Sequence, residues 1–419
     1  MKIPLAATAL IMLLLSLVVT AVVYPHILSF ALRHNIVDKP NARKLQRAPV
    51  PVMGGATIFA GFLVAMLFVP IFFNDIRIMP IVVLTGVMFF IGLWDDRNNL
   101  SASLRFVIEL IVIWFALFWF GAEINDFHGF LGVHFISDMF SVPLSLIAGV
   151  GIINAINLID GVDGYCSSYG IIASMVFAIL FYKAGDNLMC VVALITMGAL
   201  VPFFFHNVFG KKSKMFLGDG GSLFLGTLIS MFVFTALYDR SYCSKLDETG
   251  ISLVALTLAT LSIPVFDTLR VMTARVLSKH SPFKPDKTHL HHIFIEMDFS
   301  HLATSGIIML MNLFIVLVEL LLWLAGASVN VQVFTVIVLS VLATCGVYYG
   351  IRSMQTKNDG EGSPLYRKLC VYAQSTHFRS KKWWKAMTRV VDGPTLGIFE
   401  VDRKALEEKK TRKIDPRIS

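Results

Sequence analysis

The segment NAINLIDGVDG, residues 154–164, places two amides and two carboxylates in an apolar stretch that ends on glycines. Asn154, Asn157 and Asp160 recur every three residues, so a helix would hold them on one face. The glycines then let the chain turn, and Asp163 can face the same place. Hydrogen bonds between helices would explain the amides but not two added carboxylates. Because ionisable groups are costly inside a membrane, this face is a candidate functional site.

The composition of the whole chain indicates in which kind of protein this segment lies. The 419 residues are 56% hydrophobic and only 15% charged, with a mean hydropathy of +0.72, which excludes an ordinary soluble domain. Apolar runs recur, each long enough to cross a bilayer core of ~30 Å, and they lack the alternation of outer-membrane strands. We therefore predict an all-α polytopic membrane protein. About eleven transmembrane helices are expected, near residues 3–28, 54–73, 79–94, 103–120, 141–159, 168–183, 188–205, 216–238, 251–273, 305–325 and 331–351.

The charges of the loops predict the orientation of these spans. The first run is longer than the apolar core of a typical signal peptide and lacks a convincing cleavage site, so we interpret it as a retained span. An odd number of spans puts the termini on opposite sides. The loops after odd-numbered spans hold most of the Lys and Arg, which predicts that they are cytoplasmic and that the N-terminus lies outside. The loops after even-numbered spans contribute only Arg77, Lys183, Arg240 and Lys245.

The chain divides into a membrane domain, residues 1–351, and a basic tail, residues 352–419. The tail holds 16 Lys and Arg against 8 Asp and Glu, which accounts for the net charge of +8. We expect it in the cytoplasm beside anionic lipids, where KKWWK at 381–385 suits an interfacial anchor. A partly disordered basic tail is the alternative. Since the tail carries none of the candidate site residues, we expect chemistry to survive its removal.

Three further polar motifs fall at predicted cytoplasmic ends or loops, as residues 154–164 do. They are WDDRNNL at 94–100, FLGDGGSLFLG at 216–226 and PDKTHLHHIF at 285–294. The outward loops carry no comparable cluster. All four motifs can therefore meet in one site at the cytoplasmic face.

The acidic motifs offer two kinds of chemistry. Asp95 and Asp96 are adjacent and point in different directions, so one can act as a base and the other as a charge anchor. Solvated acids at a helix end are the structural alternative. Asp219 lies in a glycine-rich turn before an apolar span, a setting that can bind phosphate, although it can also be a plain capped turn. Together with Asn157 it would supply hard oxygen ligands for Mg²⁺.

The last motif is basic. His289, His291 and His292 lie in a long loop near Lys287, which fits an anionic substrate. Zinc binding and simple solvation are the alternatives, and the absence of a nearby Cys argues against zinc. Lys44, in the first predicted cytoplasmic loop, adds another cation.

Together these motifs resemble the polyprenyl-phosphate N-acetylhexosamine-1-phosphate transferases, glycosyltransferase family 4. The family signature N-x-x-N-x-x-D-G-x-D-G matches 154–164 at every position, and its paired Asp is similar to Asp95–Asp96. The G-D-x-G-S turn matches 218–222, and the His-rich loop resembles 289–292. The likeness covers about residues 1–351 and extends to eleven spans with an outside N-terminus. Within the family, the H-x-H-H loop resembles the branch that uses N-acetylglucosamine.

The resemblance implies transfer of N-acetylglucosamine-1-phosphate from a UDP-sugar to undecaprenyl phosphate, with UMP released, in a bacterial plasma membrane. It implies Mg²⁺, with Mn²⁺ as an alternative ion, on Asn157 and Asp219. The implied catalytic residues are Asp95, Asp96, Asp160 and Asp163. The implied substrate-binding residues are Asn154, Lys44, Lys287, His289, His291 and His292.

Two other functions remain open at this point. The first is the phospho-MurNAc-pentapeptide transferase branch of the same family. The second is a transporter, since acidic residues also occur within spans, although here the motifs gather at one face. We interpret four charged residues within spans as structural: Glu109, Glu319, Asp267 and Arg270. No nucleic-acid partner is expected, and a homodimer is left open.

Overall fold

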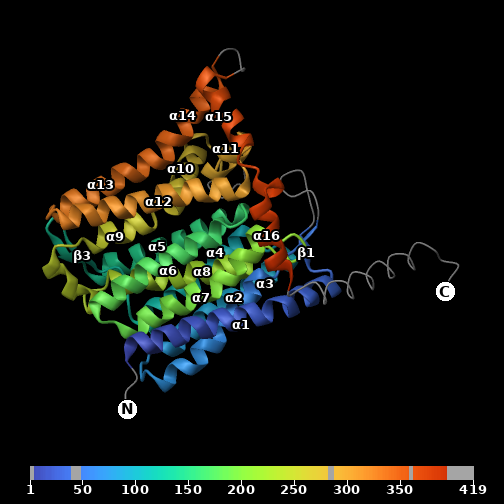
Figure 1. The fold of residues 1–419 in the computed structure, drawn as a ribbon. Coiled ribbons are helices and arrows are strands. Elements are labelled where there is room, and N and C mark those ends of the chain that lie inside the picture. Colours follow the sequence, from blue (N-terminus) through green and yellow to red (C-terminus); the bar gives the residue numbers. More distant parts are fainter. Residues whose placement is uncertain (1–3, 39–48, 282–286, 358–361, 394–419) are drawn as a thin grey trace.

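The computed structural model describes residues 4–38, 49–281, 287–357 and 362–393, and these are overwhelmingly helical (Figure 1). Within them, ten helical segments are long and apolar enough to cross a membrane, and one bent pair brings the number to eleven. This confirms the predicted all-α, multi-pass architecture. The helices of these spans are α1 (Leu5–Arg33), α2 (Gly54–Phe68), α3 (Ile78–Asn98), α4 (Ala102–Phe115), α5 (Asp138–Leu158), α6 (Tyr165–Ala184), α7 (Asn187–Phe209), α8 (Gly218–Ala236), α9 (Leu253–Thr260), α10 (Ser262–Leu277), α12 (His301–Leu324), α13 (Val329–Val341) and α14 (Val347–Gln355).

Shorter elements extend or join these helices. Two π-helical segments continue α4 and join α13 to α14, and 3-10 turns extend α2 and α5. Two small antiparallel hairpins form the described sheet structure. These elements are β1 (Val37–Asp38), β2 (Val50–Pro51), η1 (Val69–Ile71), η2 (Ala116–Phe120), β3 (Asp126–Phe130), β4 (Val133–Phe135), η3 (Ile159–Gly161), η4 (Tyr242–Thr249), α11 (Leu290–Glu296), η5 (Leu342–Gly346), α15 (Pro364–Gln374), η6 (Phe378–Ser380) and α16 (Lys382–Asp392).

The faces of α1 show how the bundle packs in lipid. Its outer face carries exposed Leu10, Leu14 and Val18, whereas its inner face carries buried small polar residues. A Cβ on Gly61 of α2 would lie 1.9 Å from the Thr20 Oγ1 of α1, so only glycine permits this approach. Large apolar side chains outside and small residues between helices are the arrangement expected of helices packed within a bilayer.

Helix α8 lies at the centre of the bundle and carries Asp219 in its first turn. It packs against α2, α3 and α5, and 94% of its span is buried within the protein. Glycines allow the backbones to meet at its first turn, since a Cβ on Gly92 of α3 would lie 2.4 Å from the Asp219 carbonyl oxygen. The surrounding spans therefore fix the position of Asp219.

The ninth span is bent, which the sequence did not predict. The segments α9 and α10 meet at an angle of 72°. Pro264, in the first turn of α10, removes a backbone donor near the break. Asn312 of α12 compensates, because its amide nitrogen donates to the carbonyls of Ala259 and Thr260, both at 3.3 Å. Breaks at membrane depth persist when protein groups satisfy the freed backbone in this way.

The two ends of the bundle differ. At one end α3 and α5 finish and α8 begins. The segment that carries His289, His291 and His292, which we call the His loop, also lies there and leads into α11; we call this the site end. At the other end lie the β3–β4 hairpin and η4, and we call this the opposite end (Figure 1). The described part of the tail also folds at the site end, where α15 packs against α14 and α16 packs against α7.

Candidate active site at the first turn of α8

Two carboxylates accept hydrogen bonds from the first N–H groups of α8. Asp96, from the last turn of α3, accepts the N–H of Asp219 at 2.9 Å and the N–H of Gly220 at 3.2 Å. Asp160, from the turn after α5, accepts the N–H of Gly218 at 3.2 Å. A helix N-terminus attracts anions, so it draws these carboxylates together. The glycine-rich turn thus binds the protein's own carboxylates, where the sequence suggested a phosphate.

A third carboxylate joins this group from the helix itself. The amide nitrogen of Asn157 lies 2.5 Å from Oδ1 of Asp219 and donates to the Ser222 hydroxyl at 2.9 Å. Asp96, Asp160 and Asp219 therefore converge on one place, with Asn157 beside them. We call these four residues the acidic cluster.

Gly218 is required by this geometry. Its φ is +76°, and a Cβ there would lie 2.6 Å from Oδ2 of Asp96. Any other residue would strain the backbone and displace the carboxylate. This explains why a glycine must precede Asp219.

The acidic cluster has the donor set of a hard divalent cation. Its three aspartates are half-buried, so they are reachable from the site end while the start of α8 around them is packed. Three carboxylates held close together repel one another, and a cation relieves that repulsion. Carboxylate and amide oxygens are the ligands that Mg²⁺ prefers. The donor types of these residues therefore suit a magnesium ion.

Asp95 points away from the cluster, as its position next to Asp96 on one helix requires. It is buried, accepts the N–H of Leu100 at 2.7 Å and lies 3.4 Å from the guanidinium of Arg105. Asp95 is thereby tied to the start of α4.

Arg105 continues this chain of contacts toward Asn154. Its guanidinium lies 3.5 Å from the buried carboxylate of Glu109, one turn further along α4. Asn154 donates its amide to the same carboxylate. Asn154 therefore contacts the Arg105–Glu109 pair, whereas Asn157 contacts Asp219.

Asp163 forms a separate ion cluster. Its Oδ2 lies 2.5 Å from Nζ of Lys214 and 3.0 Å from Nδ1 of His301. Burial raises the pKa of Asp163, but the hydrogen bond from His301 and the charges of Lys214 and His301 lower it more, to about 2. Asp163 is therefore ionised throughout the physiological range, and it holds Lys214 near the start of α8.

The His loop is anchored on the bent span. His289 Nδ1 lies 3.0 Å from Oδ2 of Asp267, whose Oδ1 accepts from Arg270 at 2.7 Å. Arg270 also donates to the Thr288 carbonyl at 2.6 Å, and the Leu290 N–H donates to Asp267. The buried Asp267–Arg270 pair thus positions the predicted substrate-binding loop.

The three histidines differ in exposure. His289 and His291 are buried, whereas His292 is half-buried. A Cβ on Gly161 would lie 3.0 Å from Nε2 of His291, so this imidazole borders the turn that carries Asp160. Burial and the neighbouring histidines hold the pKa of His291 well below its usual range and, with Lys287, lower that of His292 to about 4. Both rings are neutral at pH 7.

The structure describes only one of the two lysines that were predicted to bind substrate. Lys287 is exposed beside the His loop. Lys44 lies outside the described residues.

Several contacts were missed by sequence reasoning. Lys214, His301 and Arg105 touch predicted site residues, yet they lie 51, 138 and 10 positions from their partners. Lys214 had a usable signal, because it precedes the G-D turn by four residues in a predicted cytoplasmic loop. His301 and Arg105 carried no motif.

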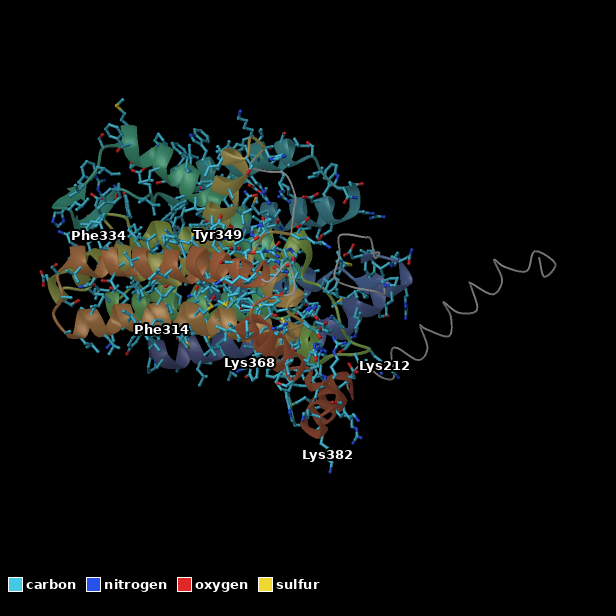
Figure 2. All side chains as sticks on the ribbon, turned by 90° about the horizontal axis from the view of Figure 1, so that it is seen from above. Lys212, Phe314, Phe334, Tyr349, Lys368 and Lys382 are labelled. Carbon is cyan, nitrogen blue, oxygen red and sulfur yellow. The ribbon has the colours of Figure 1, made fainter. Side chains whose placement is uncertain are left out.

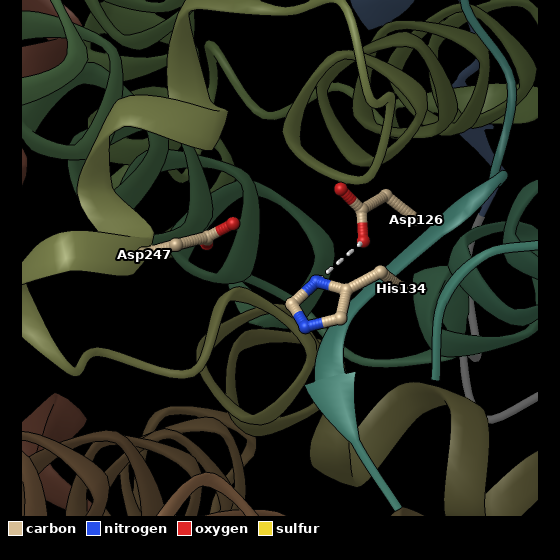
Figure 3. A group of neighbouring side chains, drawn as sticks. All are labelled: Asp126, His134 and Asp247. Atoms are coloured by element: carbon tan, nitrogen blue, oxygen red, sulfur yellow. Dashed lines mark ion pairs between the residues drawn. The ribbon is translucent and has the colours of Figure 1, made fainter. Parts of the chain in front are cut away.

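A second polar cluster lies at the opposite end. Asp126, His134 and Asp247 place possible ligand atoms within 4.8 Å of one another, and Asp126 and His134 are 4.0 Å apart (Figure 3). His128 Nδ1 already lies 2.9 Å from the Asp247 carboxylate, which pins the hairpin to η4. This cluster is far from the motif residues, so it is not the predicted ligand set.

Comparisons with known proteins match the segments that form this site. The sequence model of glycosyl transferase family 4 matches residues 78–237, which include Asp95, Asp96, the 154–164 segment and Asp219. A probable undecaprenyl-phosphate N-acetylglucosaminyl 1-phosphate transferase of Bacillus subtilis is 30% identical over 304 residues, covering 71% of this chain and 80% of the relative.

Two further relatives have related names. A decaprenyl-phosphate N-acetylglucosaminephosphotransferase of Mycolicibacterium smegmatis is 29% identical, over 65% of this chain and 71% of its own length. An undecaprenyl-phosphate alpha-N-acetylglucosaminyl 1-phosphate transferase of Escherichia coli is 27% identical, over 63% of this chain and 70% of its own length. The order of the motifs, the helical architecture and these matches show that the chain belongs to glycosyl transferase family 4, the polyprenyl-phosphate N-acetylhexosamine-1-phosphate transferases.

Proposed function

We propose that this protein transfers N-acetylglucosamine-1-phosphate from UDP-N-acetylglucosamine to undecaprenyl phosphate, giving undecaprenyl-diphospho-N-acetylglucosamine and UMP. The observation that carries the proposal is the acidic cluster at the first turn of α8, built from three motifs of the family. The names of the relatives support the sugar and the lipid carrier. Such a transfer would be the first membrane step of a cell-envelope polysaccharide, for example a lipopolysaccharide O-antigen.

The reaction joins two anions. An oxygen of the lipid phosphate forms a bond to the phosphorus that carries the sugar, and the bond from that phosphorus to the UMP oxygen breaks. The site must hold the reactants in line and offset their negative charge. Lys214, held by Asp163, and Lys287 are cations at the site end that can meet the incoming phosphates.

Asp96, Asp160, Asp219 and the amide oxygen of Asn157 would hold Mg²⁺ or Mn²⁺. The ion would supply charge neutralisation for the diphosphate and the departing UMP. In the structure the amide nitrogen of Asn157 faces Asp219, and rotating the amide by half a turn would present its oxygen to the same place.

The remaining aspartates take different roles in this proposal. Asp95 is held by Arg105 and a backbone N–H, which favours charge anchoring near the site over proton transfer. Asp163 is ionised and orients Lys214. Asp160 accepts the N–H of Gly218, the residue before Asp219, so its carboxylate lies at the same turn and would help to hold the ion.

The position of the site suits a lipid and a soluble nucleotide together. The cluster lies at the ends of spans, where a carrier phosphate at headgroup depth can meet a nucleotide from the aqueous side. The loop charges predict that this side is the cytoplasm, with the N-terminus outside and the tail inside, in a bacterial plasma membrane. UDP-sugars are thereby on the correct side.

A donor comparison tests the proposed sugar. Within the described residues, His289 contacts Asp267 and His291 borders Gly161, and this packed arrangement favours a donor sugar without a peptide. Purified protein with undecaprenyl phosphate should release UMP from UDP-N-acetylglucosamine and not from UDP-MurNAc-pentapeptide. Efficient use of the pentapeptide donor alone would assign the protein to the other branch. No UMP release with any nucleotide sugar would contradict the proposed chemistry and reopen the transporter hypothesis.

A further inference from the structure

The helix α16 carries an exposed apolar stripe beside a cationic stripe. Trp383, Ala386 and Val390 recur at helical spacing and are all exposed, with 46% of Trp383 and 71% of Val390 accessible. Lys382, Lys385 and Arg389 form a second exposed stripe next to the first, and exposed Lys381 directly precedes the helix. A helix with adjacent apolar and basic faces of this kind suits the boundary between lipid headgroups and acyl chains.

The remaining face of α16 fixes the helix to the protein. Thr388 donates to the Phe209 carbonyl at 3.0 Å, and Trp384 packs on the Phe209 ring. Buried Asp392 accepts the N–H groups of Lys211 and Lys212 at 3.3 and 3.2 Å. It also accepts the N–H of Ser213 at 3.1 Å and its hydroxyl at 2.7 Å. The helix is therefore held in a defined orientation.

These contacts fix the depth of α16 relative to the bilayer. Phe209 is the last residue of the span α7, so a helix that packs on it lies at headgroup level. Figure 1 shows α16 running across the end of the bundle, and Figure 2 shows Lys382 at the edge of the molecule, away from the spans. A helix in this position extends over the lipid beside the bundle.

Aromatic contacts continue from α16 onto the lipid-facing surface. Trp383 meets the Phe209 ring edge-on at 6.5 Å, and Phe209 stacks on Phe205 at 6.0 Å. Phe205 is 38% exposed on a membrane span and therefore faces lipid. Trp383 thus extends an aromatic surface that is already in contact with the bilayer, and tryptophan is favoured at that depth.

We propose that α16 docks on the anionic lipid surface at the site end, with Trp383 in the headgroup boundary and Lys381, Lys382 and Lys385 on lipid phosphates. A bilayer accounts for both exposed stripes, because acyl chains take the apolar stripe and phosphates take the cations. An acidic partner protein would account for the cations alone. The docked helix would also stabilise the 211–213 backbone through Asp392.

A fluorescent label on the exposed stripe tests this docking. Ala386→Cys in the full-length protein, with Cys345→Ser and Cys370→Ser, leaves only buried native cysteines. An environment-sensitive dye at position 386 should emit at shorter wavelength in vesicles that contain phosphatidylglycerol than in phosphatidylcholine alone. Salt should reverse the shift, since the attraction is electrostatic.

Charge-matched variants control the result. Lys381→Gln, Lys382→Gln and Lys385→Gln together should abolish the shift. Lys183→Gln, Arg240→Gln and Lys245→Gln, which remove three charges at the opposite end, should leave it unchanged. Emission that is equal in both lipids, or a shift that survives the first triple variant, would overturn the proposal. A shift that vanishes when protein is diluted in lipid would assign the face to a second copy and would also overturn it.

Discussion

The amide nitrogen of Asn157 lies 2.5 Å from a carboxylate oxygen of Asp219, although the two residues come from motifs 62 positions apart. Asp96 and Asp160 complete the group through the first N–H groups of α8. A central helix, buried over most of its length, thus begins at a cluster of three half-buried carboxylates. This relationship makes the start of α8 the place where the proposed ion and diphosphate meet.

Gly218→Ala should abolish transfer while leaving the bundle inserted. A Cβ at this position would displace Asp96, in addition to the left-handed strain of about 1–2 kcal/mol. Gly250→Ala is the matched control, because its φ of +77° is the same to within a degree but its Cβ would meet open space. Steady-state UMP release separates the two effects. Equal activity of both variants would show that the Asp96 contact is dispensable.

His289→Ala and His291→Ala should each lower kcat/KM for UDP-N-acetylglucosamine by at least ~10-fold, about 1.4 kcal/mol. His289 is anchored on Asp267 and His291 borders the Asp160 turn, so both rings shape the donor side of the cluster. His134→Ala, at the opposite end, serves as the control. Activity retained by both site variants would remove the His loop from donor binding.

Histidine burial predicts a pH dependence of stability. The pKa of His292 falls from 6.5 to about 4 on folding, so the unfolded chain binds the proton more readily between these values. Stability from this residue is therefore present above pH 6.5 and lost as the pH falls toward 4. The pKa of Asp163 falls from 3.8 to about 2 on folding, so this residue changes the pH dependence of stability only below about pH 4. The apparent midpoint of thermal unfolding should fall less steeply with acid in His292→Gln than in wild type. Parallel curves for the two proteins would contradict this assignment.

The tail should matter more for turnover than its separation in sequence suggests. Asp392 binds the 211–213 backbone, and Lys214 follows directly with its contact to Asp163. Asp392→Asn places an amide N–H₂ opposite those N–H donors. We expect hydrogen exchange at 211–213 to accelerate by at least ~10-fold, and transfer to slow. Asp298→Asn, an exposed acid with a positive φ that Asn tolerates, is the control. Unchanged hydrogen exchange in Asp392→Asn would contradict this role of Asp392. Full activity after removal of residues 352–419 would restore the expectation that the tail is dispensable.

The membrane spans and the acidic cluster could be predicted because each depends on short, continuous segments of the sequence. Apolar runs of sufficient length define spans, and motifs at the ends of neighbouring spans on one face must lie close together. Contacts between distant segments could not be predicted in this way. The Lys214–Asp163 pair, the capping of the bent α9–α10 span by Asn312 and the seat of α16 on residues 211–213 all depend on tertiary packing. Pro264 removes a backbone donor near the break, and the partner Asn312 explains why the break is tolerated.

The most direct test of the account is transfer by Asp219→Ala at saturating Mg²⁺. Asp219 is the member of the cluster that α8 itself supplies, and Asn157 contacts it. The account predicts that the variant inserts normally but loses Mg²⁺-dependent UMP release, and that Asp219→Asn recovers little, since an amide supplies oxygen without charge. Asp138→Asn, an exposed acid at the opposite end, should retain full activity. If Asp219→Ala keeps more than about a tenth of the wild-type rate, the acidic cluster is not where the transferred phosphate is held.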